Sequence, residues 1–213
     1  MSDGRRLPVY LVLDTSGSMA GDPIEAVRQG MKALVAELKG DPQALETAFL
    51  SVITFNSSAL QVAPLADLMS FKEPVVDAGG STAMGEALRV LQQCIDREVA
   101  KTTPDKKGDW KPLIFLMTDG QPTDSWEAEA DKLKQKRVGN IIACAAGSGA
   151  NETLLKRITE TVVKLNNLQP DTLKAFFKWV SSSIKTTSQS IAQVPAGQPT
   201  NLPPPPPQVT IVP

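Results

Sequence analysis

The chain has 213 residues, of which 41% are hydrophobic and 21% charged, so it can bury a sizeable core and lacks the composition of a disordered protein. Its formal net charge at pH 7 is −1, which gives no electrostatic reason to expect nucleic acid or an anionic membrane as a partner. The chain contains no histidine, which excludes a Ser-His-Asp or Cys-His hydrolase and a histidine-ligated zinc site.

Strand and helix signals alternate along the chain, which is typical of an α/β protein. In chain order, the sequence predicts a strand at 8–13, a helix at 23–38 with Asp22 as its cap, strands at 48–55 and 59–62, a helix at 82–101, a strand at 113–117, a helix at 126–137, a strand at 140–146, a helix at 151–160, a strand at 161–165 and a helix at 171–184. The predicted fold is therefore a Rossmann-like open, mostly parallel sheet with one antiparallel edge strand and helices on both faces.

The expected domain covers residues 1–188, and residues 189–213 are expected to form a Pro-rich flexible C-terminal tail. Beyond Thr186 the sequence turns to Ser, Thr, Gln and Pro, culminating in the run Pro203–Pro207, and such a composition is too poor in apolar residues to fold. The proline run could dock in an aromatic groove or act as a spacer, and Val209–Val212 could add as a strand to a sheet edge.

The most informative motif directly follows the first strand. Asp14, Ser16 and Ser18 place one carboxylate and two hydroxyls at i, i+2 and i+4 on the tip of a buried parallel strand, where oxygen ligands can converge on a hard divalent cation. Neutral hydroxyl ligands leave such an ion with enough positive charge to attract an anionic oxygen from a partner. The competing interpretation is an ordinary Ser/Gly turn between a strand and a helix.

Two further segments strengthen the metal interpretation. Thr82 lies at a predicted helix start, where its hydroxyl could reach a ligand or cap the helix. Asp119 follows the buried strand 113–117 and adds a second carboxylate at a strand's carboxyl edge. Open α/β sheets bind ligands at that edge, so the three segments are expected to meet there.

With these residues the chain resembles the von Willebrand factor A domains, whose metal-ion-dependent adhesion site is written D-x-S-x-S, then T, then D. The resemblance covers about residues 7–186, and all five motif positions match. It implies that the two serines and the threonine coordinate the ion directly, and that the two aspartates bind it directly or through water. The expected metal ligands are Asp14, Ser16, Ser18, Thr82 and Asp119. The expected ion is Mg²⁺, with Mn²⁺ or Ca²⁺ as alternatives.

Within that family, the chain is similar to the intracellular bacterial TerY-like group associated with tellurium resistance. This similarity rests on the opening RRLPVYLVLDTSGSM, the segment WKPLIFLMTDGQPTD and the final-helix segment KAFFKWVSSSI. It implies an adaptor in a tellurium-resistance or stress phosphorylation circuit, with a Ser/Thr kinase and a PP2C-type phosphatase as partners. The function expected is therefore a non-enzymatic, metal-dependent protein-interaction module that takes a Glu or Asp from a protein partner.

Three alternatives stay open at this stage. The chain could be the von Willebrand factor A subunit of an ATPase or chelatase-like machine, or a scaffold that works through its proline tail. It could also be a phosphatase-like hydrolase with Asp14 as nucleophile, although Ser16 stands where such enzymes carry a second acid.

A cytoplasmic location is expected, because no apolar run has the length of a membrane span and the first residues lack the apolar segment of a signal peptide. The charged stretch Lys101–Lys111 is interpreted as a solvated connection.

Overall fold

The computed structural model describes residues 4–193 and 202–212, which contain a seven-stranded sheet. Its strands are β1 (Leu7–Asp14), β2 (Ala48–Phe55), β3 (Ala59–Asp67), β4 (Leu113–Thr118), β5 (Ile141–Ala146), β6 (Thr161–Leu165) and β7 (Val209–Val212). They lie in the order β3-β2-β1-β4-β5-β6-β7, and the edge strands β3 and β7 each pair antiparallel with their neighbour. The predicted open, mostly parallel sheet is confirmed, and β7 adds a second antiparallel edge strand.

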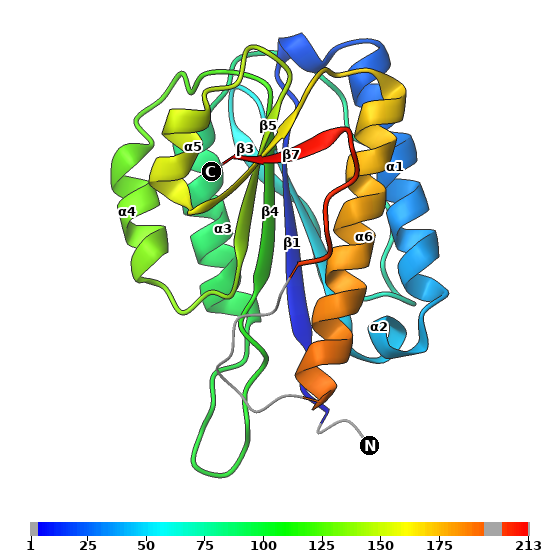
Figure 1. Ribbon diagram of the computed structural model, residues 1–213. Coiled ribbons are helices and arrows are strands. Elements are labelled where there is room, and N and C mark those ends of the chain that lie inside the picture. The colour runs from blue at the N-terminus through cyan, green and yellow to red at the C-terminus, as the bar shows by residue number, and fades with distance from the viewer. Residues whose placement is uncertain (1–3, 194–201, 213) are drawn as a thin grey trace.

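Helices cover both faces of this sheet, as Figure 1 shows. They are the short 3₁₀ helix η1 (Gly17–Met19) and the α-helices α1 (Asp22–Lys39), α2 (Pro42–Thr47), α3 (Met84–Glu98), α4 (Glu127–Gln135), α5 (Glu152–Ile158) and α6 (Pro170–Gln193). One face carries α1, α2 and α6, and the other carries α3, α4 and α5. No helix within the described ranges is both long and apolar enough to cross a membrane.

The central strand β1 shows why the sheet needs cover on both faces. Every residue of β1 is buried. Leu11 and Leu13 belong to the core under α1 and α6, whereas Tyr10 and Val12 belong to the core under α3. This division follows from the two-residue period of a strand, which sends successive side chains to opposite faces.

The chain order around β1 creates the edge at which the candidate site forms. β1 lies between β2 and β4 and is parallel to both. The connection from β1 to β2 runs through α1 on one face, and the connection from β3 to β4 runs through α3 on the other face. Such a reversal leaves a crevice at the carboxyl ends of the two central strands, where open α/β sheets bind ligands.

The edge strand β3 is longer than the predicted strand at 59–62. Proline has no backbone N–H to donate to a neighbouring strand, so Pro64 argues against a strand at this position. The structure nevertheless continues β3 to Asp67, with Pro64 exposed on the edge of the sheet. The pairing of β2 with β3 shifts register on both sides of Val52, which gives the irregularity at which an edge proline is tolerated.

The last helix, α6, continues past its predicted end at residue 184 and across the expected domain boundary at 188. Hydroxyl side chains near its end find hydrogen-bond acceptors within the helix. Ser183 and Thr187 each donate a 2.8 Å hydrogen bond to the carbonyl oxygen four residues earlier. Ser188 is buried and donates to the Gln43 carbonyl oxygen of α2 at 3.2 Å. The helix end predicted from composition is wrong, because the polar residues at this end of α6 pack against α2.

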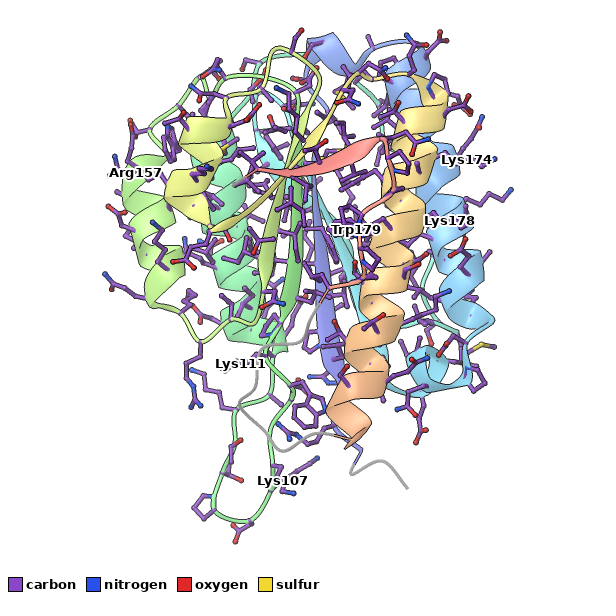
Figure 2. All side chains as sticks on the ribbon, viewed as in Figure 1. Lys107, Lys111, Arg157, Lys174, Lys178 and Trp179 are labelled. Atoms are coloured by element: carbon purple, nitrogen blue, oxygen red, sulfur yellow. The ribbon has the colours of Figure 1, made fainter. Side chains whose placement is uncertain are left out.

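The C-terminal residues that the structure describes belong to the folded domain, which corrects the expected flexible tail at 189–213. The indole Nε1 of Trp179 on α6 donates to the Pro203 carbonyl oxygen at 2.9 Å (Figure 2). Val209 is only 3% exposed, and β7 pairs antiparallel with β6. Strand addition by Val209–Val212 is thus confirmed, while residues 194–201 of the expected tail lie outside the described residues.

The contact between α1 and α6 yields a stability prediction. A Cβ added at Gly30 of α1 would lie 2.3 Å from the Phe177 Cδ2 of α6. Alanine is favoured over glycine inside a helix by about 0.5–1 kcal/mol. We nevertheless expect Gly30→Ala to lower the free energy of unfolding by about 1–3 kcal/mol, because the packed core must move. Urea denaturation measures this change.

A double variant distinguishes the clash from other effects. If the clash is the cause, Gly30→Ala combined with Phe177→Leu should be less destabilised than the sum of the two single variants, since the smaller ring-free side chain makes room. Strict additivity, or stabilisation by Gly30→Ala alone, would contradict the packing argument.

Candidate metal centre

Asp14 is the last residue of β1 and is fully buried. Its Oδ1 accepts a hydrogen bond from the Ser16 backbone N–H at 2.8 Å, and its Oδ2 accepts one from the Thr118 hydroxyl at 2.6 Å. Thr118 ends β4, so this carboxylate links the ends of the two central strands. Thr118 is not among the predicted site residues, although it directly precedes Asp119.

The turn after β1 brings three predicted ligands together. The 3₁₀ helix η1 places the hydroxyl oxygens of Ser16 and Ser18 3.1 Å apart. The Ser18 hydroxyl donates to the Asp119 Oδ1 at 2.9 Å, which connects this turn to the loop after β4. Met19, at the end of η1, is completely buried and packs this turn onto the hydrophobic core.

Thr82 lies on a third loop that is fastened to both of the others. The Gly17 N–H donates to the Gly80 carbonyl oxygen at 3.0 Å, and the Thr123 N–H donates to the Thr82 carbonyl oxygen at 2.9 Å. A Cβ added at Gly120 would lie 3.5 Å from the Thr82 Oγ1, so this hydroxyl approaches the Asp119 loop. Thr82 is 6% exposed, and its hydroxyl makes no hydrogen bond within residues 4–193 and 202–212.

The alternative that Thr82 caps α3 is wrong, because α3 is capped by another residue. Asp124 accepts hydrogen bonds at 2.9 Å from the N–H groups of Gly85 and Glu86 in the first turn of α3. By its position directly before the helix predicted at 126–137, Asp124 would be expected to cap that helix. The loop after β4 instead folds over α3, so closely that a Cβ at Gly85 would lie 2.2 Å from the Ser125 carbonyl oxygen.

The five predicted ligands therefore meet at one edge of the sheet, on three loops tied by hydrogen bonds. Their donors are two carboxylates and three hydroxyls, which form the hard oxygen set preferred by Mg²⁺ and similar cations. Within the described part of the chain, no cluster of three or more His, Cys, Asp or Glu side chains offers another metal site. The Thr82 hydroxyl has no hydrogen-bond partner among the described residues, and two carboxylates lie close by. These features fit a divalent cation held by Asp14, Ser16, Ser18, Thr82 and Asp119.

The electrostatics of Asp14 favour a cation at this point. Burial raises the pKa of the Asp14 carboxyl above its ordinary value, and the charge of Asp119 raises it further, although hydrogen bonds from Ser16 and Thr118 act in the opposite direction. A bound divalent ion would offset the cost of two neighbouring carboxylates, and its remaining charge would attract an anionic oxygen from outside.

The loops around this site form an acidic rim that contains no Lys or Arg. The rim consists of residues 14–25, 55–59, 77–86, 118–127, 146–152 and 165–171. Its carboxylates are Asp14, Asp22, Glu25, Asp77, Glu86, Asp119, Asp124, Glu127, Glu152 and Asp171. Three nearby bases pair with rim acids: Arg28 with Asp77, Arg89 with Glu86 and Lys164 with Glu152. The rim therefore keeps a surplus of negative charge.

The first prediction concerns metal binding. Wild-type protein should bind Mg²⁺ or Mn²⁺ in calorimetry, and saturation at about 100 times Kd should add about 2.7 kcal/mol to the free energy of unfolding. Asp14→Ala should lose both effects, because it removes the carboxylate that joins β1 to β4. Asp96→Ala is the matched control, since Asp96 pairs with Lys136 outside the rim. Equal metal binding by wild type and Asp14→Ala would refute the site.

A second prediction tests the role of Asp124 as a positioning residue. Asp124→Ala should cost about 1 kcal/mol of stability through loss of the α3 cap, and should weaken metal affinity about 10- to 100-fold by loosening the Thr82 loop. Asp124→Asn retains one acceptor oxygen and should give intermediate values. Thermal unfolding and calorimetry report the two effects separately. An unchanged metal affinity in Asp124→Ala would show that the cap does not position Thr82.

Several known proteins are similar to this chain. The profile of the von Willebrand factor type A domain matches residues 9–179. An uncharacterized protein of Synechocystis sp. is 34% identical over 122 residues, which are 55% of this chain and 26% of that protein. Inter-alpha-trypsin inhibitor heavy chain H3 of Mesocricetus auratus is 25% identical over 130 residues, which are 60% of this chain and 14% of that protein. The chain thus spans about a quarter or less of these relatives.

Solved structures share the fold. A von Willebrand factor type A protein from Catenulispora acidiphila superposes with a TM-score of 0.66 at 20% identity, covering 85% of this chain and 43% of that one. Proximal thread matrix protein 1 from the mussel byssus, with a zinc-occupied MIDAS motif (the metal-ion-dependent adhesion site), gives a TM-score of 0.62 at 20% identity, covering 84% and 48%. Since the family profile spans residues 9–179 and the architecture matches, the chain belongs to the von Willebrand factor type A domain family.

Proposed function

We propose that this protein is a non-catalytic, metal-dependent protein-binding module. In this proposal Asp14, Ser16, Ser18, Thr82 and Asp119 hold Mg²⁺, and a Glu or Asp from a protein partner completes its coordination. Mn²⁺ and Ca²⁺ are alternatives, because both accept the same oxygen ligands. The observation that carries the proposal is the joining of three loops through Asp14, Ser18 and Thr82, with the Thr82 hydroxyl free to bind.

The hydroxyl-rich donor set supports binding of a partner's carboxylate. Ser16, Ser18 and Thr82 contribute no charge, so an ion held beside two aspartates remains attractive to a further anionic oxygen. The zinc-occupied MIDAS motif of the mussel byssus protein supports a divalent ion at the corresponding place in this fold. The proposal assigns the metal an adhesive role and no catalytic role.

Two observations favour binding over catalysis. A nucleophilic Asp14 would need an oxygen that can reach a substrate, but Asp14 is fully buried and both of its oxygens accept hydrogen bonds. The chain also contains no histidine to act as general base. These features support a binding module and disfavour the phosphatase-like alternative.

We further propose that the protein works as an adaptor in the bacterial cytoplasm, in a tellurium-resistance or stress phosphorylation circuit. A Ser/Thr kinase and a PP2C-type phosphatase are the partners proposed for it. The support is the similarity of the segments around Asp14, Asp119 and α6 to the TerY-like group. Membership of an ATPase or chelatase-like machine would use the same residues with a different partner.

The test of the binding role compares two substitutions of Thr82. Protein complexes should be captured from the native cells by crosslinking with Mg²⁺ present and should be lost on chelation. Thr82→Ser should retain them because it keeps the ligand oxygen, whereas Thr82→Ala should lose them. Quantitative mass spectrometry of the captured proteins measures the difference. Capture that is unchanged in excess chelator would place recognition on another face of the domain.

A further inference from the structure

The segment between α3 and β4, residues 99–112, forms a hairpin that projects from the molecule. It leaves the sheet at the amino end of β4, opposite the acidic rim (Figure 1). The Asp109 N–H donates to the Ala100 carbonyl oxygen at 2.9 Å, and the Thr103 N–H donates to the Lys106 carbonyl oxygen at 2.9 Å. The Lys106 N–H in turn donates a hydrogen bond to the Thr103 hydroxyl at 3.2 Å. Pro104-Asp105 is thereby held at the tip.

The base of this hairpin is fixed to the domain. Asp109 is nearly buried and accepts hydrogen bonds from the Arg6 guanidinium at 2.5 Å and from the Ala100 N–H at 2.7 Å. The Arg5 guanidinium stacks over the Trp110 ring at 3.6 Å from its centroid. A segment that is ordered before binding loses less conformational entropy when a partner binds it.

The tip carries a carboxylate in basic surroundings. Asp105 is exposed, and its side chain makes no hydrogen bond or ion pair with any residue of the ranges 4–193 and 202–212. Lys101, Lys106, Lys107 and Lys111 lie on the same hairpin, and Figure 2 labels Lys107 and Lys111 there. The hairpin's other acid, Asp109, is neutralised by Arg6.

The acidic rim restricts which carboxylates can reach the metal. An acidic partner surface would be repelled by Asp22, Glu127 and Asp171, whereas a carboxylate among lysines would meet complementary charge. The 99–112 hairpin presents that combination, because an exposed Asp105 carboxylate lies on a segment with four lysines.

We propose that a second copy of this chain is a partner of the metal site, with its Asp105 completing the coordination of the cation. This proposal rests on the proposed function. The hairpin and the site lie at opposite ends of the sheet, so the contact is head-to-tail and cannot close as a two-fold dimer. Copies therefore add head-to-tail, in open chains or in closed rings. A hairpin tip buries less than about 1,200 Å², which predicts a weak contact that needs high protein concentration.

Sedimentation velocity of the full chain over a concentration series tests the proposal. In Mg²⁺ the wild type should form species that grow with concentration, and chelator should return it to monomer. Asp105→Ala should weaken association by on the order of tenfold or more. Asp96→Ala, which removes an exposed carboxylate elsewhere, should associate as the wild type does. Raised salt should weaken assembly through screening of the hairpin lysines and the rim.

A mixing experiment gives the sharpest outcome. Asp105→Ala keeps the site but loses the tip, and Asp14→Ala keeps the tip but loses the site. Each variant alone should be monomeric, and an equimolar mixture in Mg²⁺ should stop at a one-to-one dimer. Assembly that survives chelator or Asp105→Ala, or a mixture that stays monomeric, would overturn the proposal.

The metal site itself is judged independently in the same samples. A wild type that binds Mg²⁺ in calorimetry but stays monomeric at every concentration would overturn self-association and leave the proposed function standing. A wild type that binds no Mg²⁺ would overturn both.

Discussion

The buried carboxylate of Asp14 is the constraint on which the site depends. It ends the central strand, accepts hydrogen bonds from the Ser16 N–H and the Thr118 hydroxyl, and so joins the turn after β1 to the end of β4. Burial and the charge of Asp119 raise its pKa, so the charged form of this carboxyl is disfavoured at the site. In the proposed function, a divalent ion would offset that cost and would give this edge a means of binding an anionic partner.

Charge is distributed unevenly over a chain whose net charge is only −1. The loops at the carboxyl edge of the sheet carry acids without Lys or Arg, while the 99–112 hairpin at the opposite end carries four lysines and an exposed Asp105. An average composition conceals this polarity. This uneven charge distribution supports the proposal that the segment between α3 and β4 is a binding element, in place of the earlier interpretation of it as a solvated connection.

The sequence predicted the sheet and the meeting of the five ligands because their signals are local. Asp14, Ser16 and Ser18 follow an apolar run directly, Asp119 follows another, and parallel strands end at a common edge. The cap of α3 by Asp124 could not be predicted, because Asp124 is distant from α3 in sequence and reaches it only after the loop folds back. The strand β7 and the polar end of α6 are hard to predict from sequence for the same reason. Both are stabilised by contacts with distant segments, such as that of Trp179 with Pro203.

A crystal structure of the protein grown with Mn²⁺ tests the central claim most directly, because the anomalous signal of manganese locates the ion without assumptions about the ligands. The account predicts one strong anomalous peak at the carboxyl edge of β1 and β4, with the hydroxyl oxygens of Ser16 and Ser18 within about 2.0–2.6 Å, the range of oxygen–metal bonds for hard divalent cations. A peak elsewhere, or no peak at saturating Mn²⁺ in well-ordered crystals, would contradict it.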